Sequence, residues 1–132
     1  MSIPNRLEKL RQKLAKEEIG AVLISQPENR RYLSGFDGSA GRLLITPEHT
    51  ILATDFRYLE QARRQAPQYE IFHTAGDPAR WFPELISRLG LSRLGFEAGH
   101  IPFATYQEFS AIARKEQLNL IPTTGLVESL RV

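Results

Sequence analysis

Apolar residues recur at helical spacing near the start of the chain and form a short continuous run after it. The periodicity predicts an amphipathic helix over residues 5–20, with Asn5 as its cap and Gly20 at its left-handed stop. Its buried face is formed by Leu7, Leu10 and Leu14. The run AVLIS at residues 21–25 follows at once and is typical of a strand that is covered on both faces.

The rest of the chain alternates predicted strands with predicted helices. Two β-rich runs separated by PEH indicate a hairpin, so we expect a mixed sheet. Asp55 is expected to cap a helix that Pro67 ends. GDP at residues 76–78 indicates a cap followed by proline in a first helical turn, whereas Pro83 removes a helical hydrogen bond and favours a start of the regular helix only near Trp81. The predicted elements from the hairpin onward are strands at 42–46 and 50–54, a helix from 55, a strand at 69–73, a helix bearing Phe82, Leu85, Ile86 and Leu89, a strand at 93–97, a helix at 102–117 and a strand at 118–122.

Composition narrows the class of protein. A chain of 132 residues is the size of one domain with a core of its own. The sequence has no cysteine, which excludes disulfides, thiolate zinc sites and a cysteine nucleophile. Its 17 basic and 15 acidic residues give a net charge of only +2, so we expect neither a nucleic-acid partner nor a membrane partner. Because no long apolar segment is present, we expect a cytoplasmic protein.

The glycine cluster GFDGSAG is the first candidate for chemistry. It lacks the Gly-Lys-Ser/Thr ending of a phosphate loop and the spacing of a dinucleotide fingerprint. Ser39 is not in a nucleophile elbow, because Asp37 stands where that motif needs glycine. From these residues alone, we interpret the cluster as a mobile loop between a helix and a strand.

The histidines and the DFRY segment do not form a recognisable catalytic set either. His49, His73 and His100 lack metal-ligand spacing, and we expect them in loops or on the surface. Asp55 and Arg57 are interpreted as a helix cap with an ion pair. No acid/base pair and no metal cluster is visible in the sequence, so the residues alone predict an α/β domain and no more.

Two segments resemble the N-terminal domain of the creatinase/prolidase family, particularly that of Xaa-Pro aminopeptidases. They are NRRYLSGFDGSAG at residues 29–41 and TDFRY at residues 54–58. The opening helix with GAVLIS, the stretch RLGFEAGHIPFATYQEF and the closing LVESLRV are similar as well, so the resemblance covers essentially the whole chain. It implies a three-layer α/β/α domain with a mixed sheet in a ribonuclease-H-like arrangement. We expect this domain over residues 1–122, followed at 123–132 by the start of a linker to a catalytic domain that this chain lacks.

The resemblance also implies a function. Family members hydrolyse the bond before proline with two divalent metal ions, Mn, Co or Zn, held by the catalytic domain. This implies an Xaa-Pro metallopeptidase for the longer protein, and no catalytic residue, metal ion or other cofactor in this chain. The implied partners are the chain's own catalytic domain, a second copy in a homodimer, and a proline-containing peptide substrate.

The family's loop after the SGF segment approaches the substrate pocket of the partner subunit. Here it corresponds to residues 36–42, which we call the glycine loop. The resemblance implies Phe36 near an apolar substrate wall, and Asp37 or Arg42 where they meet a peptide terminus. In creatinases an arginine of this loop contacts the substrate carboxylate, and Arg42 is its nearest match by position. Arg57 is expected to orient the loop.

Two other functions share this architecture. One is a protein-binding module, as in relatives that have lost the metal ligands; the near-neutral charge does not support it. The other is a creatinase-type amidinohydrolase, although GFDGSAG is closer to the aminopeptidase version. Fold alone does not choose between substrates.

Overall fold

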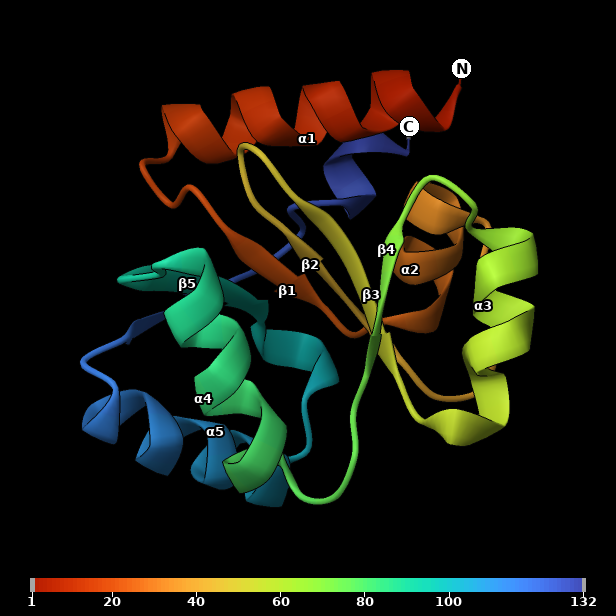
Figure 1. Ribbon diagram of the computed structural model, residues 1–132. Coiled ribbons are helices and arrows are strands. Elements are labelled where there is room, and N and C mark those ends of the chain that lie inside the picture. The colour runs from red at the N-terminus through yellow and green to blue at the C-terminus, as the bar shows by residue number, and fades with distance from the viewer. Residues whose placement is uncertain (1, 132) are drawn as a thin grey trace.

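A six-stranded mixed sheet forms the centre of the computed structural model, which describes residues 2–131 (Figure 1). The strands are β1 (Val22–Ile24), β2 (Arg42–Ile45), β3 (Thr50–Thr54), β4 (Glu70–His73), β5 (Arg93–Glu97) and β6 (Asn119–Thr123). The helices are α1 (Ile3–Lys16), α2 (Pro27–Ser34), α3 (Leu59–Gln65), α4 (Pro78–Leu89) and α5 (Phe103–Lys115), with 3₁₀ turns η1 (Phe56–Tyr58), η2 (Ala98–His100) and η3 (Glu128–Leu130).

In the sheet, whose strand order is β4-β3-β2-β1-β5-β6, the carboxyl ends of most strands lie at one edge. β2 runs antiparallel to both β1 and β3, and every other neighbouring pair is parallel. The carboxyl ends of β1, β3, β4, β5 and β6 therefore lie at the same edge as the start of β2. We call this the carboxyl edge; it is the lower edge in Figure 1. Ligand sites of open α/β sheets usually lie at such an edge.

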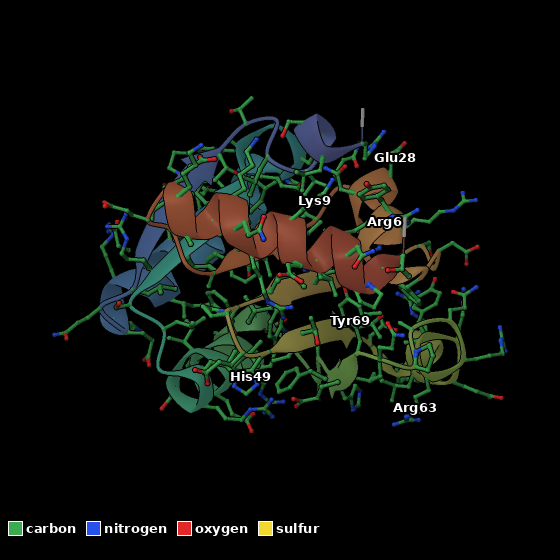
Figure 2. All side chains as sticks on the ribbon, turned by 90° about the horizontal axis from the view of Figure 1, so that it is seen from above. Arg6, Lys9, Glu28, His49, Arg63 and Tyr69 are labelled. Carbon is green, nitrogen blue, oxygen red and sulfur yellow. The ribbon has the colours of Figure 1, made fainter. Side chains whose placement is uncertain are left out.

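Helices cover both faces of the sheet, which confirms the predicted three-layer α/β class. Alternation along β2 sends Leu43 and Ile45 into the core under α1, α2 and α3, and Leu44 into the core under α4 and α5. All three side chains are fully buried. Seen from above, α1 lies across the first of these faces (Figure 2). The predicted hairpin is also confirmed as β2 and β3.

The first helix begins earlier than its apolar periodicity predicted. The N-cap is Ser2 instead of Asn5, and the Ser2 hydroxyl accepts a hydrogen bond from the Asn5 N–H at 3.3 Å. Pro4 fits in the first turn, where helical N–H groups have no helical partner. The helix ends at Lys16, before Gly20, because the chain already turns left-handed at Glu18, whose φ is 58°.

Helix α4 takes the earlier of its two predicted starts, at the GDP segment, because Pro83 does not delay it. The helix begins at Pro78 and contains Pro83 in its interior. An interior proline costs about 3 kcal/mol. Burying one large apolar side chain returns about 1.5–3 kcal/mol. The helix buries four such side chains, which outweighs the lost bond: Trp81, Phe82, Leu85 and Ile86.

Two segments were poorly described by periodicity. Helix α2 received no predicted bounds, because its buried residues include the polar Asn29 and Arg30. The segment predicted as the start of a linker includes Thr123 as the end of β6, and it places Leu126 and Val127 in the core under α1. The predicted boundary between domain and linker, at 122/123, stays a prediction. The outer ends of the two predicted segments, residues 1 and 132, lie outside the described residues. No helix within residues 2–131 is long and apolar enough to cross a membrane.

The aromatic centre of the α4/α5 core provides a test of the packing. Phe82 is 1% exposed, and the centre of its ring lies 4.6 Å from the centre of the Phe109 ring. We expect Phe82→Ala to lower the free energy of unfolding in urea by about 3–5 kcal/mol, since it leaves a cavity. Phe103→Ala is the matched control. Phe103 is 73% exposed, so its loss should change stability by less than about 0.5 kcal/mol. Equal effects of the two variants would contradict this assignment of the core.

Candidate functional site

The glycine loop lies at the carboxyl edge, between the end of α2 and the start of β2, and beside η1 (Figure 1). Gly35 ends α2 in the left-handed conformation, with φ of 82°, and its N–H donates to the Arg31 carbonyl. Glycine is favoured there because a side chain would be strained at this φ. The chain then turns along the edge and enters β2.

Asp37 ties the outer side of the loop to helix α3. One carboxylate oxygen, Oδ1, accepts hydrogen bonds from the side-chain amides of Gln61 and Gln65, each at 2.9 Å. The Asp37 N–H donates in turn to Gln65 Oε1 at 3.1 Å. The hydrogen bond from Gln65 is the main reason that the pKa of Asp37 lies below its ordinary value.

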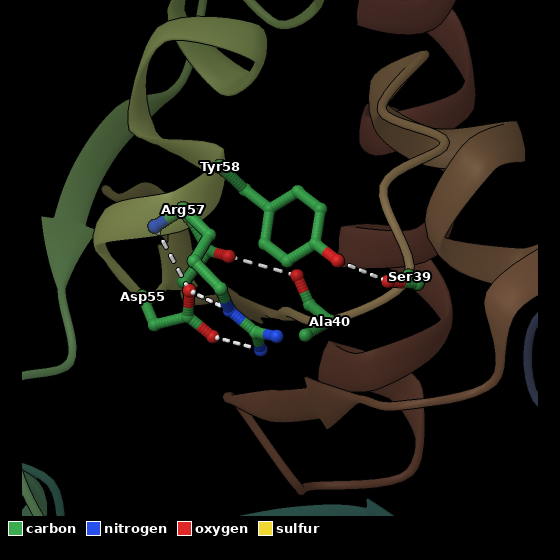
Figure 3. Close-up of polar contacts among 6 residues, drawn as sticks. Ser39, Ala40, Asp55, Arg57 and Tyr58 are labelled. Carbon is green, nitrogen blue, oxygen red and sulfur yellow. Dashed lines mark hydrogen bonds and ion pairs between the residues drawn. The ribbon is translucent and has the colours of Figure 1, made fainter.

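The middle of the loop is tied to the end of β3 and to η1. Thr54 donates its hydroxyl proton to the Ala40 carbonyl at 2.8 Å, and the hydroxyls of Ser39 and Tyr58 share a hydrogen bond (Figure 3). The ring of Phe36 meets that of Tyr58 edge-on, with 6.3 Å between their centres. These contacts connect the loop to the DFRY segment.

Arg30 supports the loop from α2. Its Nη1 donates to the Gly41 carbonyl at 2.6 Å and its Nη2 to the Gly38 carbonyl at 2.5 Å. Arg30 is only 4% exposed, and burial followed by the nearby charge of Arg42 lowers its pKa. Every residue from 37 to 41 thus takes part in a hydrogen bond to another element. The interpretation of the cluster as a mobile loop does not fit this arrangement, because the bonds come from side chains distant in sequence.

Phe36 explains why two of the loop residues are glycine. A β-carbon on Gly38 would lie 2.3 Å from a ring atom of Phe36, which is closer than any real contact. At Gly41 it would lie 3.2 Å from the same ring, and φ there is 150°. The loop therefore wraps directly over the Phe36 ring, which is 0% exposed.

The other residues predicted for the site lie in two different places. Arg57 is in η1 near the loop, where its side chain folds back onto Asp55 with two hydrogen bonds of 3.0 and 2.9 Å (Figure 3). This pairing raises the pKa of Arg57 and lowers that of Asp55. The predicted cap and ion pair of DFRY are confirmed.

Arg42 points to the opposite face of the sheet, toward α5. Its guanidinium lies 5.3 Å from the centre of the Phe109 ring, and burial lowers its pKa. Within residues 2–131, neither Arg42 nor Arg30 forms a salt bridge, and the buried Nε of each has no hydrogen-bond partner. The structure therefore does not bring Arg42 together with Asp37 and Arg57, which lie on the other side of the loop.

Glu97 holds the start of α2 in place beside the site. It ends β5 at the carboxyl edge and is 6% exposed. Its Oε1 accepts the N–H groups of Ser25 and Gln26 at 2.6 and 2.7 Å, and its Oε2 accepts the side-chain amide of Asn29 at 2.7 Å. The side-chain oxygen of Asn29, Oδ1, accepts from Arg131 Nη1 at 2.6 Å. A buried carboxylate is thus fully paired with donors, as such groups must be.

The remaining features of the described residues that bear on function are the histidines, a pocket and two exposed aromatic side chains. No three His, Asp or Glu side chains within residues 2–131 converge as a metal site would require. The three histidines are exposed, as predicted. The loop and α2 border an open pocket of about 390 Å³, whose lining includes Glu28, Arg31 and Asp37. Phe56 and Phe103, both at the carboxyl edge, are 73% exposed. This edge thus offers an open pocket and two exposed aromatic side chains for contact with another molecule.

Sequence analysis missed the residues that shape the site. Four residues that hold the site in shape have no role in the predictions from sequence: Arg30, Gln61, Gln65 and Glu97. Two signals were present. Gln61 and Gln65 are four residues apart, so they share one helix face. Glu97 directly follows the apolar run of residues 94–96 in a strand, where a charged residue needs a partner.

Comparison with known proteins gives concordant matches. The model of the "Creatinase/Prolidase N-terminal domain" matches residues 6–132. The "Uncharacterized peptidase YqhT" of Bacillus subtilis is 36% identical over 96% of this chain, which spans 35% of that protein. An Xaa-Pro dipeptidase from Bacillus anthracis has a TM-score of 0.88 at 36% identity, over 98% of this chain and 36% of the other. The N-terminal domain of the cytoplasmic peptidase PepQ from Mycobacterium tuberculosis H37Rv gives 0.86 at 35%, over 96% and 98%.

The Glu97 network provides a stability test. In Glu97→Gln, the new amide group would face the Asn29 amide, donor against donor, and turning Asn29 around would instead oppose Arg131. We expect the free energy of unfolding in urea to fall by about 1–3 kcal/mol, since a buried donor loses its acceptor. Glu84→Gln, on the exposed side of α4, is the matched control and should be neutral. A neutral Glu97→Gln would show that this network does not hold α2.

The pKa of Asp37 tests the connection to α3. We expect the carboxyl pKa measured by NMR titration to rise toward its ordinary value of 3.8 in Gln65→Leu, because the hydrogen bond from Gln65 is the largest cause of its lowering. A lowered carboxyl pKa stabilises the fold above the ordinary value, and this contribution disappears as the pH falls through the lowered one. The variant should therefore lose less stability than the wild type on acidification below that value. An unchanged pKa would contradict the contact.

Proposed function

The chain belongs to the creatinase/prolidase N-terminal domain family, and we propose that it serves as the non-catalytic N-terminal domain of an Xaa-Pro aminopeptidase or dipeptidase. The main support is the family match over residues 6–132 together with the likeness to an Xaa-Pro dipeptidase. The chain spans about a third of the length of such relatives, so catalysis is assigned to a further domain. That domain would hold two divalent metal ions, Mn, Co or Zn, which activate water; no step is assigned to a metal ion within this chain.

We propose that the carboxyl edge encloses the substrate and meets a second copy of the protein. The observation that carries this proposal is the glycine loop, which hydrogen bonds from several other elements of the chain hold in one shape. A loop that is fixed in advance loses little conformational entropy when it closes a binding site. The exposed side chains of Phe56 and Phe103 support docking of this edge onto a catalytic domain, its own or that of the partner in a homodimer.

The side chains proposed to contact the substrate differ in whether other contacts already occupy their polar atoms. Arg42 forms no salt bridge within residues 2–131, although the charge of Glu108 acts on it, and we assign its guanidinium to binding a peptide carboxylate. Asp37 uses Oδ1 for its glutamine contacts, which leaves Oδ2 for a peptide amino terminus. Arg57 is bound to Asp55, and we assign it to orienting the DFRY segment. Phe36 is covered, so we assign it to supporting the loop from beneath.

A location in the cytoplasm is part of the proposal. It agrees with the description of the Mycobacterium tuberculosis neighbour as a cytoplasmic peptidase. The charge balance, at +2, gives no reason to expect a nucleic-acid or membrane partner.

Peptidase activity tests the proposal directly. We expect Xaa-Pro hydrolysis by the longer protein that carries this domain, with Mn²⁺, Co²⁺ or Zn²⁺ added, and none by the 132-residue chain under the same conditions. Activity of the short chain would overturn the non-catalytic role. Inactivity of the longer protein with all three metals would instead favour a protein-binding module.

Arg42 provides a sharper test of the substrate contact. In the longer protein, we expect Arg42→Gln to raise KM for an Xaa-Pro dipeptide about tenfold to a hundredfold, with a much smaller effect on the amidated dipeptide, which has no terminal carboxylate. Arg114→Gln, an exposed arginine of α5, is the matched control. Equal effects of Arg42→Gln on the two peptides would show that Arg42 does not bind the carboxylate.

A further inference from the structure

We propose that Arg30 fixes the shape of the glycine loop and is a positioning residue for the substrate contacts that the loop makes. The first part stands on the geometry of the loop alone. The second part rests on the proposed function. Arg30 borders the pocket beside the loop but is only 4% exposed, and both of its terminal nitrogens are bound to loop carbonyls, so we infer that it acts on a ligand through the loop.

The two carbonyls that Arg30 binds belong to Gly38 and Gly41, the ends of the tightest part of the loop. One guanidinium reaches both because its terminal nitrogens are held in a planar fork. Setting the two carbonyls side by side fixes the path of Ser39 and Ala40 between them. A lysine at the same place is a point donor and does not impose this spacing.

Burial makes this arrangement costly, which argues for a specific role. Arg30 is 96% covered, lies beside the like charge of Arg42 and has no salt bridge within the described residues. Its compensation comes from the two carbonyls and from the Phe36 ring, whose centre lies 5.6 Å from the guanidinium carbon. Without Arg30, both carbonyls would lose their donor.

The backbone of Arg30 also connects α2 to the start of the loop. Its carbonyl accepts the Ser34 hydroxyl at 2.6 Å, and the Ser34 oxygen accepts the Phe36 N–H at 3.0 Å. The side chain and the backbone of one residue thus hold Phe36, Gly38 and Gly41. The contacts of Asp37, Ser39 and Ala40 each secure one point of the loop.

NMR relaxation of the 132-residue chain tests the first part without any substrate. We expect backbone order parameters of residues 38–41 near 0.85 in the wild type and below about 0.6 in both Arg30→Met and Arg30→Lys. Amides of β2 and β3 should stay at their wild-type values, which would show that the domain remains folded. Arg31→Met, the exposed neighbour on α2, is the matched control and should leave the loop unchanged.

Order parameters that stay near 0.85 in a folded Arg30→Lys would overturn the proposal, and so would a loop that loosens equally in Arg31→Met. If Arg30→Met does not fold, Arg30→Lys decides, because it keeps the charge and most of the volume.

Kinetics of the longer protein test the second part. We expect Arg30→Lys to lower kcat/KM for an Xaa-Pro peptide about tenfold, mainly through KM, while Arg114→Gln, on the exposed side of α5, leaves it unchanged. A loosened loop with wild-type kinetics would overturn the positioning role and the substrate-enclosing function, yet leave the structural role of Arg30 intact. Wild-type order parameters with full activity would overturn the role of Arg30 alone.

Discussion

The buried Glu97 carboxylate is the interaction on which the geometry of the carboxyl edge depends. It joins the end of β5 to the first turn of α2 through three hydrogen bonds, and Asn29 extends the connection to Arg131. α2 buries mostly polar residues, so apolar packing alone would define its position poorly. The charge sets the helix in one place, and from there Arg30 reaches the glycine loop. A polar network is therefore responsible for the shape of the site.

The sheet was predictable because its strands follow simple rules. Short β-rich runs and the PEH turn predicted the mixed sheet, and the structure confirms it. The helix starts were hard to predict where two local effects compete. At Pro83, a lost hydrogen bond opposes the burial of neighbouring aromatic side chains, and burial prevails. At the first helix, the apolar pattern begins at Leu7, whereas the cap that starts the helix lies at Ser2, outside the pattern.

The site was predictable only in part, for a different reason. The resemblance located the glycine loop and the DFRY segment, and the structure places them side by side. Strand alternation already implied the face of Arg42, because Arg42 shares its parity with Leu44, which packs under α5. The partners of the loop follow no local rule: Asp37 meets Gln65 across 28 residues, and Glu97 meets Asn29 across 68. Side-chain hydrogen bonds between residues so far apart in the sequence produce no periodic pattern in it.

In the proposed function, where the carboxyl edge encloses a peptide, Arg42 and Asp37 lie on different sides of the glycine loop. The glycine loop passes between them, so a single extended ligand that met both would have to cross the loop. Asp37 carries the negative charge on the α3 side, and Arg42 the positive charge on the α5 side, while Arg30 lies buried between. Opposite charges on the two sides of a fixed loop favour one direction of a peptide that has an amino and a carboxyl terminus. A rigid loop keeps the charges of Asp37 and Arg42 on opposite sides, whereas a mobile loop would not hold the two charges in fixed positions.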